Sequence, residues 1–431
     1  MSNNIFKGKN DIAWEKLFKK YEILEEINKN NYFKIKSSQI KEFNEPRLMT
    51  KFDHKKQLPQ LFIDNNLAIL PLTRGSYIIS EMETYHDFET QKTKIRSVEF
   101  PANIQSIDIN NITSEATAIN IAHIAGMVED FTGEASRLTV SGRMSSGEFS
   151  FNIFNRRIDN FSIDIKKSQI EIDAGFETDT SLLLFEVKNS VSDDFLIRQL
   201  YYPYRLWQAK IQKQIRSIYM IYSNGIFTMY EYKFEQIDFY NSTKLIKKQA
   251  YKFEEEAINI QDITSIASRT SIIPEPTDVP FPQADNFSRV VNLCEMLFEF
   301  KTLSKDYITI NYDFDARQTD YYANAAIYLG LIVKSRNQKN GTIYQLSEIG
   351  NSLFNKTIRD RNLTFVELIL SHKVFKDTFI KHIEESEMPA KEFIVQSMKE
   401  SKIHNVTAEE TFKRRTSTVI SWINWILELI S

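Results

Sequence analysis

The segment 170–189, IEIDAGFETDTSLLLFEVKN, carries charged residues inside long apolar runs. Asp173 lies in its first half, and Glu186 and Lys188 lie near its end. Charges at the rim of an apolar sheet need compensation, because removing them from water costs free energy. A divalent cation would compensate the carboxylates, and a few hard oxygen ligands with room for water suit Mg²⁺. A lysine beside them can orient a water molecule or stabilise charge on a phosphate oxygen, so these residues fit metal-assisted hydrolysis of a phosphodiester.

Two β-strands joined by a turn are expected to position these residues. Side chains alternate between the two faces of a strand. In residues 181–189, one face therefore carries Leu183, Phe185 and Val187, and the other carries Leu182, Leu184, Glu186 and Lys188. Both faces are apolar until the end, which is typical of a central strand covered on both sides. The preceding strand presents Glu171, Asp173 and Gly175 on one face, so a tight hairpin predicts Asp173 close to Glu186.

A structural ion pair is the alternative interpretation, in which Lys188 only pairs with Asp173 or Glu186. Three observations favour a chemical site over that alternative. The strand is unusually apolar, the aspartate lies on the preceding strand, and a helix that carries Gln199 follows directly. Gln199 either faces the site from this helix or is an ordinary glutamine at the edge of the core.

The elements that follow complete a sheet. Residues 193–210, DDFLIRQLYYPYRLWQAK, indicate a helix capped by Ser192 or Asp193, with a bend or a new turn at Pro203. RSIYMIYS and IFTMYEYKF then indicate two strands around the Asn-Gly turn at 224–225. The order strand, strand, helix, strand, strand predicts an α/β or α+β core, in which helices flank a mixed sheet.

A helix is also expected upstream, over residues 114–133, because its small and apolar residues fall at helical spacing up to Gly133. Glu129 and Glu134 near its end are candidates for a further metal ligand, and each is otherwise a solvated charge at a helix end. The segment 136–154 indicates strands joined by Ser/Gly turns. One such turn holds residues that could reach DNA beside a cut, namely Arg143, Ser145 and Ser146.

The C-terminal part follows the densest cluster of prolines, residues 271–286. Two amphipathic helices over 287–300 and 315–332 precede two short strands, which is the order of a winged helix-turn-helix. Arg, Gln and Asn side chains can make paired hydrogen bonds to base edges. The candidates for base contacts on the second helix are Arg317, Gln318, Tyr321, Tyr322 and Asn324. The candidates for phosphate contacts are Lys334, Arg336 and Lys339 in the wing and Arg414 and Arg415 on the last helix. The alternative for the second helix is an exposed face with its tyrosines in the core, and the alternative for each basic residue, Arg143 included, is a solvated surface charge.

The pattern of Asp173, then Glu186-Val187-Lys188, then Gln199 on the next helix resembles the PD-(D/E)XK nucleases, although Ile172 replaces the proline that often precedes the aspartate. With RLMTKFDHKKQLP…LAILPLTRGSYII, VSGRMSSGEFSFNI and FKRRTSTVISWINWI, most of the chain resembles type II restriction endonucleases. The resemblance implies a Mg²⁺ site that cleaves duplex DNA at a defined sequence and leaves 5′-phosphates. It further implies a homodimer on a palindromic target and a cognate DNA methyltransferase as genetic partner.

Composition sets the limits of these interpretations. A chain of 431 residues predicts two or three domains. We expect an N-terminal region over 1–112, a nuclease core over 113–265, a linker over 266–284 and a winged-helix-like domain over 285–431. The net charge of −3 argues neither for nor against DNA binding. The single cysteine excludes an intramolecular disulfide and a cysteine zinc site. With no signal peptide and no apolar run of about 18 residues, a cytoplasmic location is expected.

Two other functions remain as alternatives. The first is another nuclease with the same core, acting in repair or encoded by a mobile element. The second is a winged-helix DNA-binding regulator whose nuclease-like core is only structural. Mg²⁺-dependent cleavage of unmethylated DNA distinguishes an enzyme from the regulator.

Overall fold

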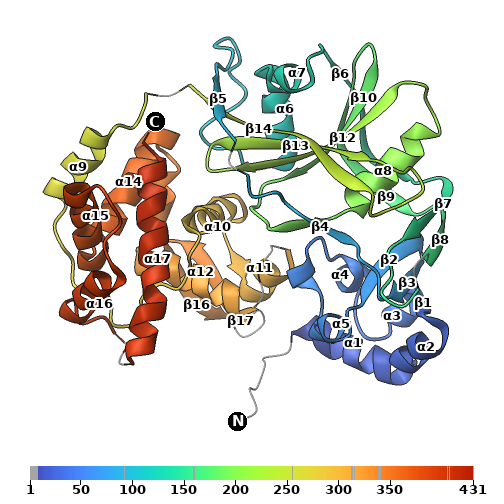
Figure 1. The fold of residues 1–431 in the computed structure, drawn as a ribbon, viewed down its shortest axis with the longest axis horizontal. Coiled ribbons are helices and arrows are strands. Elements are labelled where there is room, and N and C mark those ends of the chain that lie inside the picture. The colour runs from blue at the N-terminus through green and yellow to red at the C-terminus, as the bar shows by residue number, and fades with distance from the viewer. Residues whose placement is uncertain are drawn as a thin grey trace.

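The computed structural model describes residues 8–430 apart from 92, 159–160, 255, 312–313, 315, 338–340, 405 and 407. The chain is mixed α+β, with 41% helix and 28% strand, and its C-terminal region is helical. Figure 1 shows this helical region on the left, in orange and red, and a large sheet at the upper right. None of the helices in the described ranges is both long and apolar enough to cross a membrane.

Residues 8–80 form an N-terminal unit of short helices around a three-stranded sheet, ordered β1-β3-β2. Its elements are α1 (Lys9–Lys20), α2 (Ile23–Asn30), β1 (Tyr32–Lys36), α3 (Ser37–Ile40), α4 (Pro46–Thr50), the 3₁₀ turn η1 (Lys55–Gln57), α5 (Gln60–Asp64), β2 (Ala68–Thr73) and β3 (Ser76–Ser80). One face of the sheet packs on the helices around Trp14 and Phe62, whose ring centroids lie 4.8 Å apart. The other face, with Leu70 and Ile78, packs against the central part of the chain.

Residues 81–257 form a central unit around a seven-stranded sheet, ordered β5-β14-β13-β12-β10-β9-β6. Its strands are β4 (Tyr85–Asp87), β5 (Ile95–Val98), β6 (Arg137–Ser145), β7 (Glu148–Ile153), β8 (Phe161–Lys166), β9 (Gln169–Glu177), β10 (Ser181–Lys188), β11 (Asp194–Leu196), β12 (Gln214–Ser223), β13 (Ile226–Phe234) and β14 (Thr243–Phe253). Its helices are α6 (Glu115–Ile124), α7 (Met127–Thr132) and α8 (Arg198–Gln208). The pairs β4–β11 and β7–β8 lie outside the large sheet.

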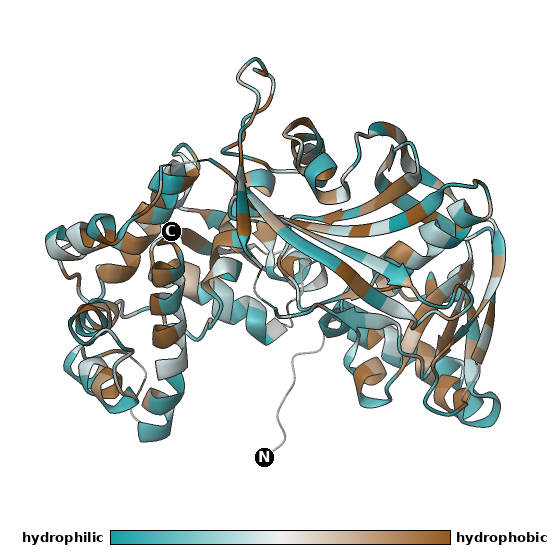
Figure 2. Ribbon diagram, turned by 45° about the horizontal axis from the view of Figure 1, so that its top comes forward, coloured by the Kyte–Doolittle hydropathy of each residue, from teal (hydrophilic) through white to brown (hydrophobic). Residues whose placement is uncertain are grey.

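Strand β10 is a central strand, in agreement with its two apolar faces. It pairs antiparallel with β9 and parallel with β12. Leu183 and Phe185 pack on the side of α6 and α7, whereas Leu182 and Leu184 pack on the side of Trp207 in α8. Parallel strands need a crossover connection, and α8 provides it between β10 and β12. Figure 2 shows hydrophobic residues, in brown, distributed along the strands of this sheet.

The helix after β10 starts later than the sequence predicted. Residues 194–196 form β11 and pair with β4, so the helix begins at Arg198 and has no cap at Ser192 or Asp193. A pairing with a strand far upstream leaves no local signal in the sequence. Helix α8 also continues through Pro203 to Gln208, so the expected new turn does not occur.

The helix expected over 114–133 is divided in two. Ser114 caps α6, and its side chain accepts a hydrogen bond from the backbone of Thr117. Gly126 has a φ of 72°, a left-handed conformation that favours glycine, and it separates α6 from α7. The predicted turn between β12 and β13 is present, with positive φ at both Asn224 and Gly225.

Residues 258–430 form a C-terminal unit with one hydrophobic core. Its elements are α9 (Ile260–Arg269), α10 (Phe287–Phe300), β15 (Leu303–Ser304), α11 (Lys305–Asn311), α12 (Ala316–Tyr328), β16 (Ile332–Asn337), β17 (Gly341–Leu346), α13 (Glu348–Leu353), α14 (Ile358–Leu370), α15 (Lys373–Glu385), α16 (Lys391–Glu400) and α17 (Glu409–Glu428). The two expected helices and the expected hairpin are present, with β15 and α11 in addition. Within the expected linker 266–284, Val279, Phe281 and Ala284 are buried in this core.

The N-terminal and C-terminal units both contact the loop between β10 and β11. Asp193 in this loop pairs with Lys56 of the N-terminal unit at 2.6 Å and with Arg289 of α10 at 2.9 Å. Asn292 of α10 also donates a hydrogen bond of 2.6 Å to the carbonyl of Asn189, directly after β10. Both outer units are therefore docked beside the end of the strand that carries Glu186 and Lys188.

Candidate functional site

Strands β9 and β10 separate at the candidate site. Their ladder ends at the pair of Phe185 and Ala174. Beyond this pair, the next residue on β9 is Asp173. Its Oδ2 accepts a hydrogen bond of 2.7 Å from the backbone nitrogen of Val187. The carboxylate thus replaces a backbone acceptor where the strands diverge. This places Asp173 beside Glu186, as the hairpin interpretation expected.

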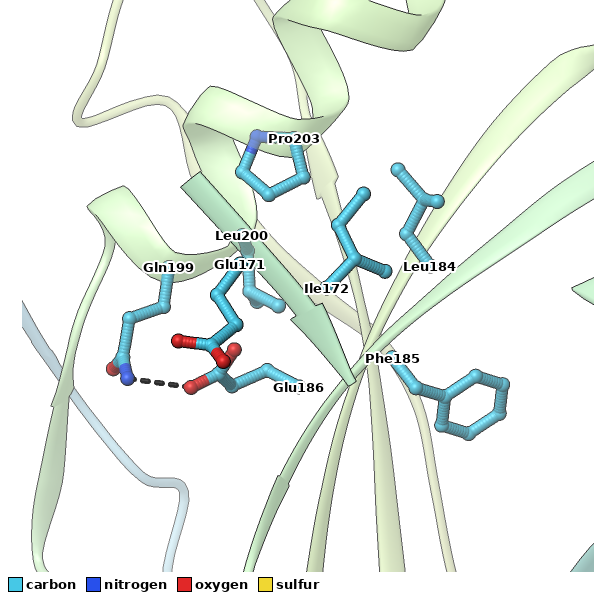
Figure 3. Close-up of a pocket in the computed structure, with 8 residues that line it drawn as sticks. All are labelled: Glu171, Ile172, Leu184, Phe185, Glu186, Gln199, Leu200 and Pro203. Atoms are coloured by element: carbon cyan, nitrogen blue, oxygen red, sulfur yellow. Dashed lines mark hydrogen bonds between the residues drawn. The ribbon is translucent and has the colours of Figure 1, made fainter. Parts of the chain in front are cut away.

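Glu186 is the centre of a buried hydrogen-bonded group, and its side chain is only 11% exposed. Lys188 Nζ donates to Glu186 Oε1 at 2.5 Å, and Gln199 Nε2 donates to the same oxygen at 2.6 Å. Gln199 comes from the first turn of α8, and Figure 3 shows its side chain pointing at Glu186. The structure therefore brings Asp173, Glu186, Lys188 and Gln199 together, while their chemical roles stay predictions.

Burial and neighbouring charges shift the pKa values of Glu186 and Lys188. Burial and the negative charge of Asp173 raise the pKa of Glu186 to about 8, against the opposing effect of Lys188. Burial disfavours the charged form of Lys188, but Glu186 and Glu115 together raise its pKa well above the ordinary lysine value. The site thus holds a lysine that stays charged and a glutamate whose negative charge is disfavoured. A bound cation would favour that negative charge.

The upstream glutamate that reaches this group is Glu115 rather than Glu129. Glu115 is the first residue of α6, and its Oε1 lies 3.8 Å from Lys188 Nζ. Partial burial and the charge of Asp173 raise the pKa of Glu115. Glu129 is exposed on α7 and, within the described residues, has no hydrogen bond or ion pair to the group around Glu186. The prediction of Glu129 as a metal ligand is corrected accordingly.

The direction of α6 and α7 explains this correction. The carbonyl of Thr132, at the end of α7, accepts from Arg216, which is in register with Leu183 in the first half of β10. The carboxylate of Glu134 accepts a hydrogen bond of 2.6 Å from Thr180 in the β9–β10 turn. The end of the predicted helix therefore lies at the opposite end of β10 from Glu186. The sequence indicated the helix but not which of its ends meets the site.

Two residues that the sequence interpretation did not single out lie at or near the site. Tyr219 on β12 is in register with Glu186 and fully buried, and its hydroxyl has no hydrogen-bond partner among the described residues. Asp53 comes from the N-terminal unit, and its side chain is 13% exposed. Burial opposes the charge of Asp53, but the positive charges of Lys51 and Lys188 lower its pKa. Long-range packing brings both residues to the site, so no local pattern marks them.

Arg143 and Ser146 lie along the edge strand next to this group. Arg143 is exposed within β6, and its Nε donates to Glu171 Oε1 at 3.1 Å. Glu171 lines a small pocket together with Glu186 and Gln199, so Arg143 stays a candidate for DNA contact (Figure 3). Ser146 is 1% exposed, and its hydroxyl donates to a neighbouring carbonyl. A buried hydroxyl is not available to DNA, so the prediction for Ser146 is wrong.

The candidates for base contacts lie on α12, which is helical as expected. Arg317 is exposed, and its Nε donates to the Tyr321 hydroxyl at 2.5 Å. Gln318, Tyr321 and Asn324 are half-buried. Tyr322 is buried in the core of the C-terminal unit, which removes it from the set that could face DNA.

The wing candidates lie on and after β16. Lys334 and Arg336 are exposed on this strand, where a phosphate could reach them. Lys339 lies outside the described residues. The two described lysine and arginine side chains therefore keep the predicted role of phosphate contacts.

Arg414 and Arg415 are neighbours in α17 with opposite surroundings. Arg414 is exposed, whereas Arg415 is 7% exposed. The guanidinium of Arg415 donates to the carbonyl of Phe281, and burial lowers its pKa to about 10. Arg415 therefore holds the segment before α10 in place, and its prediction as a phosphate contact is wrong.

The donor chemistry around β10 fits a divalent cation. Carboxylates of Asp173, Glu186 and Glu115 are the hard oxygen ligands that Mg²⁺ prefers. Gln199 Oε1 and the Tyr219 hydroxyl are buried and unpartnered in the described part of the chain, so further oxygens are available. Over those residues, no three His, Cys, Asp or Glu side chains are already arranged around a metal position. The Lys188 ammonium and the Gln199 amide both donate to Glu186 Oε1, so a cation at this carboxylate would bind Oε2 or displace the ammonium from Oε1.

Comparison with known proteins finds three family models along the chain. Residues 11–79, 80–252 and 289–431 each match a domain of unknown function, DUF6996, DUF6997 and DUF7226 respectively. No curated protein and no solved structure matches the chain. The first two models meet at the end of β3, where the N-terminal unit gives way to the central unit. The site around Glu186 lies in the second matched segment, apart from Asp53 in the first.

Proposed function

We propose that this chain is a Mg²⁺-dependent endonuclease of the type II restriction kind, which hydrolyses duplex DNA at a defined sequence and leaves 5′-phosphates. The observation that carries the proposal is the convergence of Asp173, Glu186, Lys188 and Gln199 at the end of β10. The order of a helix, an antiparallel hairpin, a crossover helix and a parallel strand supports it, because this order agrees with the resemblance to the PD-(D/E)XK nucleases.

Each residue of the site has a role in this proposal. Asp173 and Glu186 would hold Mg²⁺, with Glu115 beside them, and the bound ion would polarise the phosphate and acidify a water molecule. Lys188 stays protonated, so its ammonium can donate a hydrogen bond to a non-bridging phosphate oxygen. Gln199 holds the Glu186 carboxylate in place through Oε1. The water oxygen bonds to phosphorus while the bond to O3′ breaks, which leaves a 5′-phosphate and a 3′-hydroxyl.

The C-terminal unit would read the DNA sequence. Its elements α10, β15, α11, α12 and the β16–β17 hairpin follow the order of a winged helix, in which the last helix before the hairpin enters the major groove. Arg317, Gln318 and Asn324 on α12 are proposed to contact bases, and Lys334 and Arg336 to contact phosphates. A palindromic target would require a homodimer. A neighbouring DNA methyltransferase gene would support a role in restriction, which would take place in the cytoplasm.

A DNA-binding regulator without catalysis is the second candidate. The completed pairing of Glu186 with Lys188 and Gln199 favours it, because a structural ion pair needs no cation. A repair or mobile-element nuclease would share the site and differ in its choice of substrate.

Incubation of the full chain with unmethylated supercoiled plasmid separates these functions. One reaction contains Mg²⁺ and a parallel reaction contains EDTA. The proposal predicts discrete fragments with Mg²⁺ and intact plasmid with EDTA. Binding without cleavage under both conditions would support the regulator, and cleavage at scattered positions would support a different nuclease.

A further inference from the structure

Strand β10 ends at Lys188, and the chain after it leaves the sheet. Lys188 is the last residue of β10 in register with β12, where it lies opposite Ile221. The next carbonyl, that of Asn189, accepts a hydrogen bond of 2.6 Å from Asn292 Nδ2 on α10. A side chain of the C-terminal unit therefore binds the backbone directly after Lys188.

Asn189 also joins the two elements that bring Lys188 and Glu115 together. Its side-chain Nδ2 donates to the carbonyl of Thr113 at 3.1 Å. Thr113 directly precedes Ser114, the cap of α6, and Glu115 is the first residue of that helix. The distance of 3.8 Å between Lys188 Nζ and Glu115 Oε1 thus depends on where Asn189 is held.

Arg289, one turn before Asn292 on α10, binds the other end of the same loop. Its guanidinium donates to Asp193 Oδ1 at 2.9 Å. Arg289 is 3% exposed and Asn292 is 5% exposed, and buried polar groups persist where hydrogen bonds replace their contacts with water. Residues three positions apart are neighbours on a helix surface, so one face of α10 contacts both ends of the loop 189–193.

Polar contacts of this kind determine how α10 lies on the central unit. The buried core of the C-terminal unit begins at Ile258, and the buried cores of the central unit end at Phe253. Glu295 on the same helix accepts a hydrogen bond of 3.0 Å from the backbone nitrogen of Asn224. Because each unit has its own core, a single hydrogen bond between them can be removed without disrupting either core.

Helix α10 also packs on α12, the helix proposed to contact bases. The guanidinium carbon of Arg289 lies 5.6 Å from the ring centroid of Phe314. Phe314 stacks on Tyr322 of α12, with ring centroids 4.7 Å apart. Helix α10 is thus in contact with the proposed reading helix and with the loop that follows β10.

We propose that Arg289 and Asn292 are positioning residues for the site at the end of β10, through which the C-terminal unit sets the place of Lys188. The inference rests on the proposed function and makes cleavage depend on the unit that would read the sequence. Both residues act through the loop 189–193 and not on the DNA. Their loss should therefore slow cleavage without weakening DNA binding.

Single-turnover cleavage of unmethylated plasmid by an excess of the full chain with Mg²⁺ tests this assignment. Asn292→Ala removes the donor to the Asn189 carbonyl, and the rate constant should fall about ten- to a hundredfold, because a displacement of about 1 Å at a site can cost that much. Affinity for the same DNA in EDTA should stay within about twofold of the wild type. Ser223→Ala is the matched control, because it removes a hydrogen bond of 3.2 Å from the end of β12 to Glu295 and leaves the loop untouched.

Asp193→Asn is a second variant that does not threaten folding, because this side chain is 65% exposed. It weakens the pair with Arg289, and since exposed ion pairs contribute little, the rate constant should fall only about two- to fivefold. Lys56→Met is its control, because it removes the pairing of Asp193 with the N-terminal unit and leaves Arg289 in place.

Slower cleavage at unchanged DNA affinity in Asn292→Ala and Asp193→Asn, with wild-type rates in both controls, would support the assignment. Wild-type rates in both variants, a parallel loss of DNA affinity, or equal losses in the variants and their controls would overturn it and leave the proposed function standing. An intact plasmid with the wild-type protein would overturn both.

Discussion

The end of β10 and the surface of α12 carry similar polar residues under opposite conditions. At β10, Glu186 and Lys188 are 11% and 14% exposed, and each has a partner at 2.5 Å. On α12, Arg317 is exposed and Gln318 and Asn324 are half-buried on a helix that faces solvent along one side. Burial costs free energy at the first region, whereas the second region keeps its polar groups in water at little cost.

The two regions therefore support a function to different degrees. A buried charged group persists only if packing and hydrogen bonds hold it, so its geometry is a demanding observation. An exposed arginine such as Arg317 needs no special support, so its exposure is compatible with DNA contact and with solvation alone. The proposal of cleavage therefore rests on contacts, and the proposal of sequence reading rests on the order of elements.

The largest effect is expected from Glu186→Gln. The amide cannot carry the negative charge that would hold Mg²⁺, which is worth several kcal/mol, so cleavage should fall on the order of a thousandfold or more. DNA binding should stay near the wild-type level, because affinity comes mainly from phosphate and base contacts elsewhere. Glu177→Gln, at the other end of β9 and paired with Lys213, is the control that should cut normally. Wild-type cleavage by the Glu186 variant would show that the site is misassigned.

Lys188→Met should separate catalysis from cation binding. Loss of the ammonium removes a donor to the phosphate oxygen, so single-turnover cleavage should fall about a hundredfold. Mn²⁺ binding should hold or become tighter, because the ammonium that now occupies Glu186 Oε1 is gone. If cleavage and Mn²⁺ binding collapse together, the Lys188–Glu186 pair is a structural support and not a catalytic one.

Arg414 and Arg415 allow an exposed and a buried charge to be compared within one helix, α17. Arg415→Ala should lower the free energy of unfolding by about 1.5–3 kcal/mol, because it removes the hydrogen bond from the guanidinium to the Phe281 carbonyl and leaves that carbonyl without its donor. Arg414→Ala should leave stability unchanged and weaken DNA binding. Urea unfolding of both variants, followed by tryptophan fluorescence, checks the pair. Equal stability of the two variants would contradict the assigned burial of Arg415.

Arg317→Ala and Asn324→Ala test whether α12 reads bases. A lost paired contact to a base edge costs about 1–3 kcal/mol of discrimination, so binding to the cognate duplex should weaken about tenfold or more. Binding to a scrambled duplex should change little. If both duplexes lose affinity equally, the sequence is read elsewhere, and exposed Arg143 at the sheet edge is the next candidate.

The smallest effect is expected from Lys334→Ala and Arg336→Ala in the wing. Each would remove a single phosphate contact, so affinity should fall alike on cognate and scrambled duplexes. The dependence of binding on salt should flatten by about one unit of slope. Salt titrations of each variant on both duplexes measure this. A loss confined to the cognate duplex would assign the wing to base reading instead.

The sequence predicted the local parts of this fold well. The alternation in SLLLFEVKN indicated a central strand, and the ETDT turn placed Asp173 next to Glu186. The Asn-Gly turn at 224–225 and the helix 287–300 were also apparent, because their signals lie in neighbouring residues. The helix predicted over 315–332 is present as α12 but ends earlier, at Tyr328, and Ile332 already belongs to β16. The residues around Glu186 could therefore be assembled from strand periodicity, turn length and one following helix.

Long-range packing accounts for the differences between the predicted and the observed structure. Because β11 pairs with β4, α8 begins later in the chain than predicted, and no local pattern in the sequence indicates a pairing partner so far upstream. The direction of α6 brings Glu115 rather than Glu129 to Lys188. The docking of the N-terminal unit brings the backbone of Asp53 against β11, and the packing of Phe281 buries Arg415. In each case the residue type was apparent from the sequence, but its distance from residues in other elements was not.

Sequencing of the DNA ends after digestion tests the central claim most directly. Wild-type chain and Glu186→Gln would each be incubated with a plasmid of known sequence and Mg²⁺, and every new end would be mapped. We expect that wild-type ends carry 5′-phosphates and share one short sequence, and that the Glu186 variant produces none of them. An intact plasmid with excess wild-type protein, or the same ends from the variant, would contradict a cation-assisted nuclease site at the end of β10.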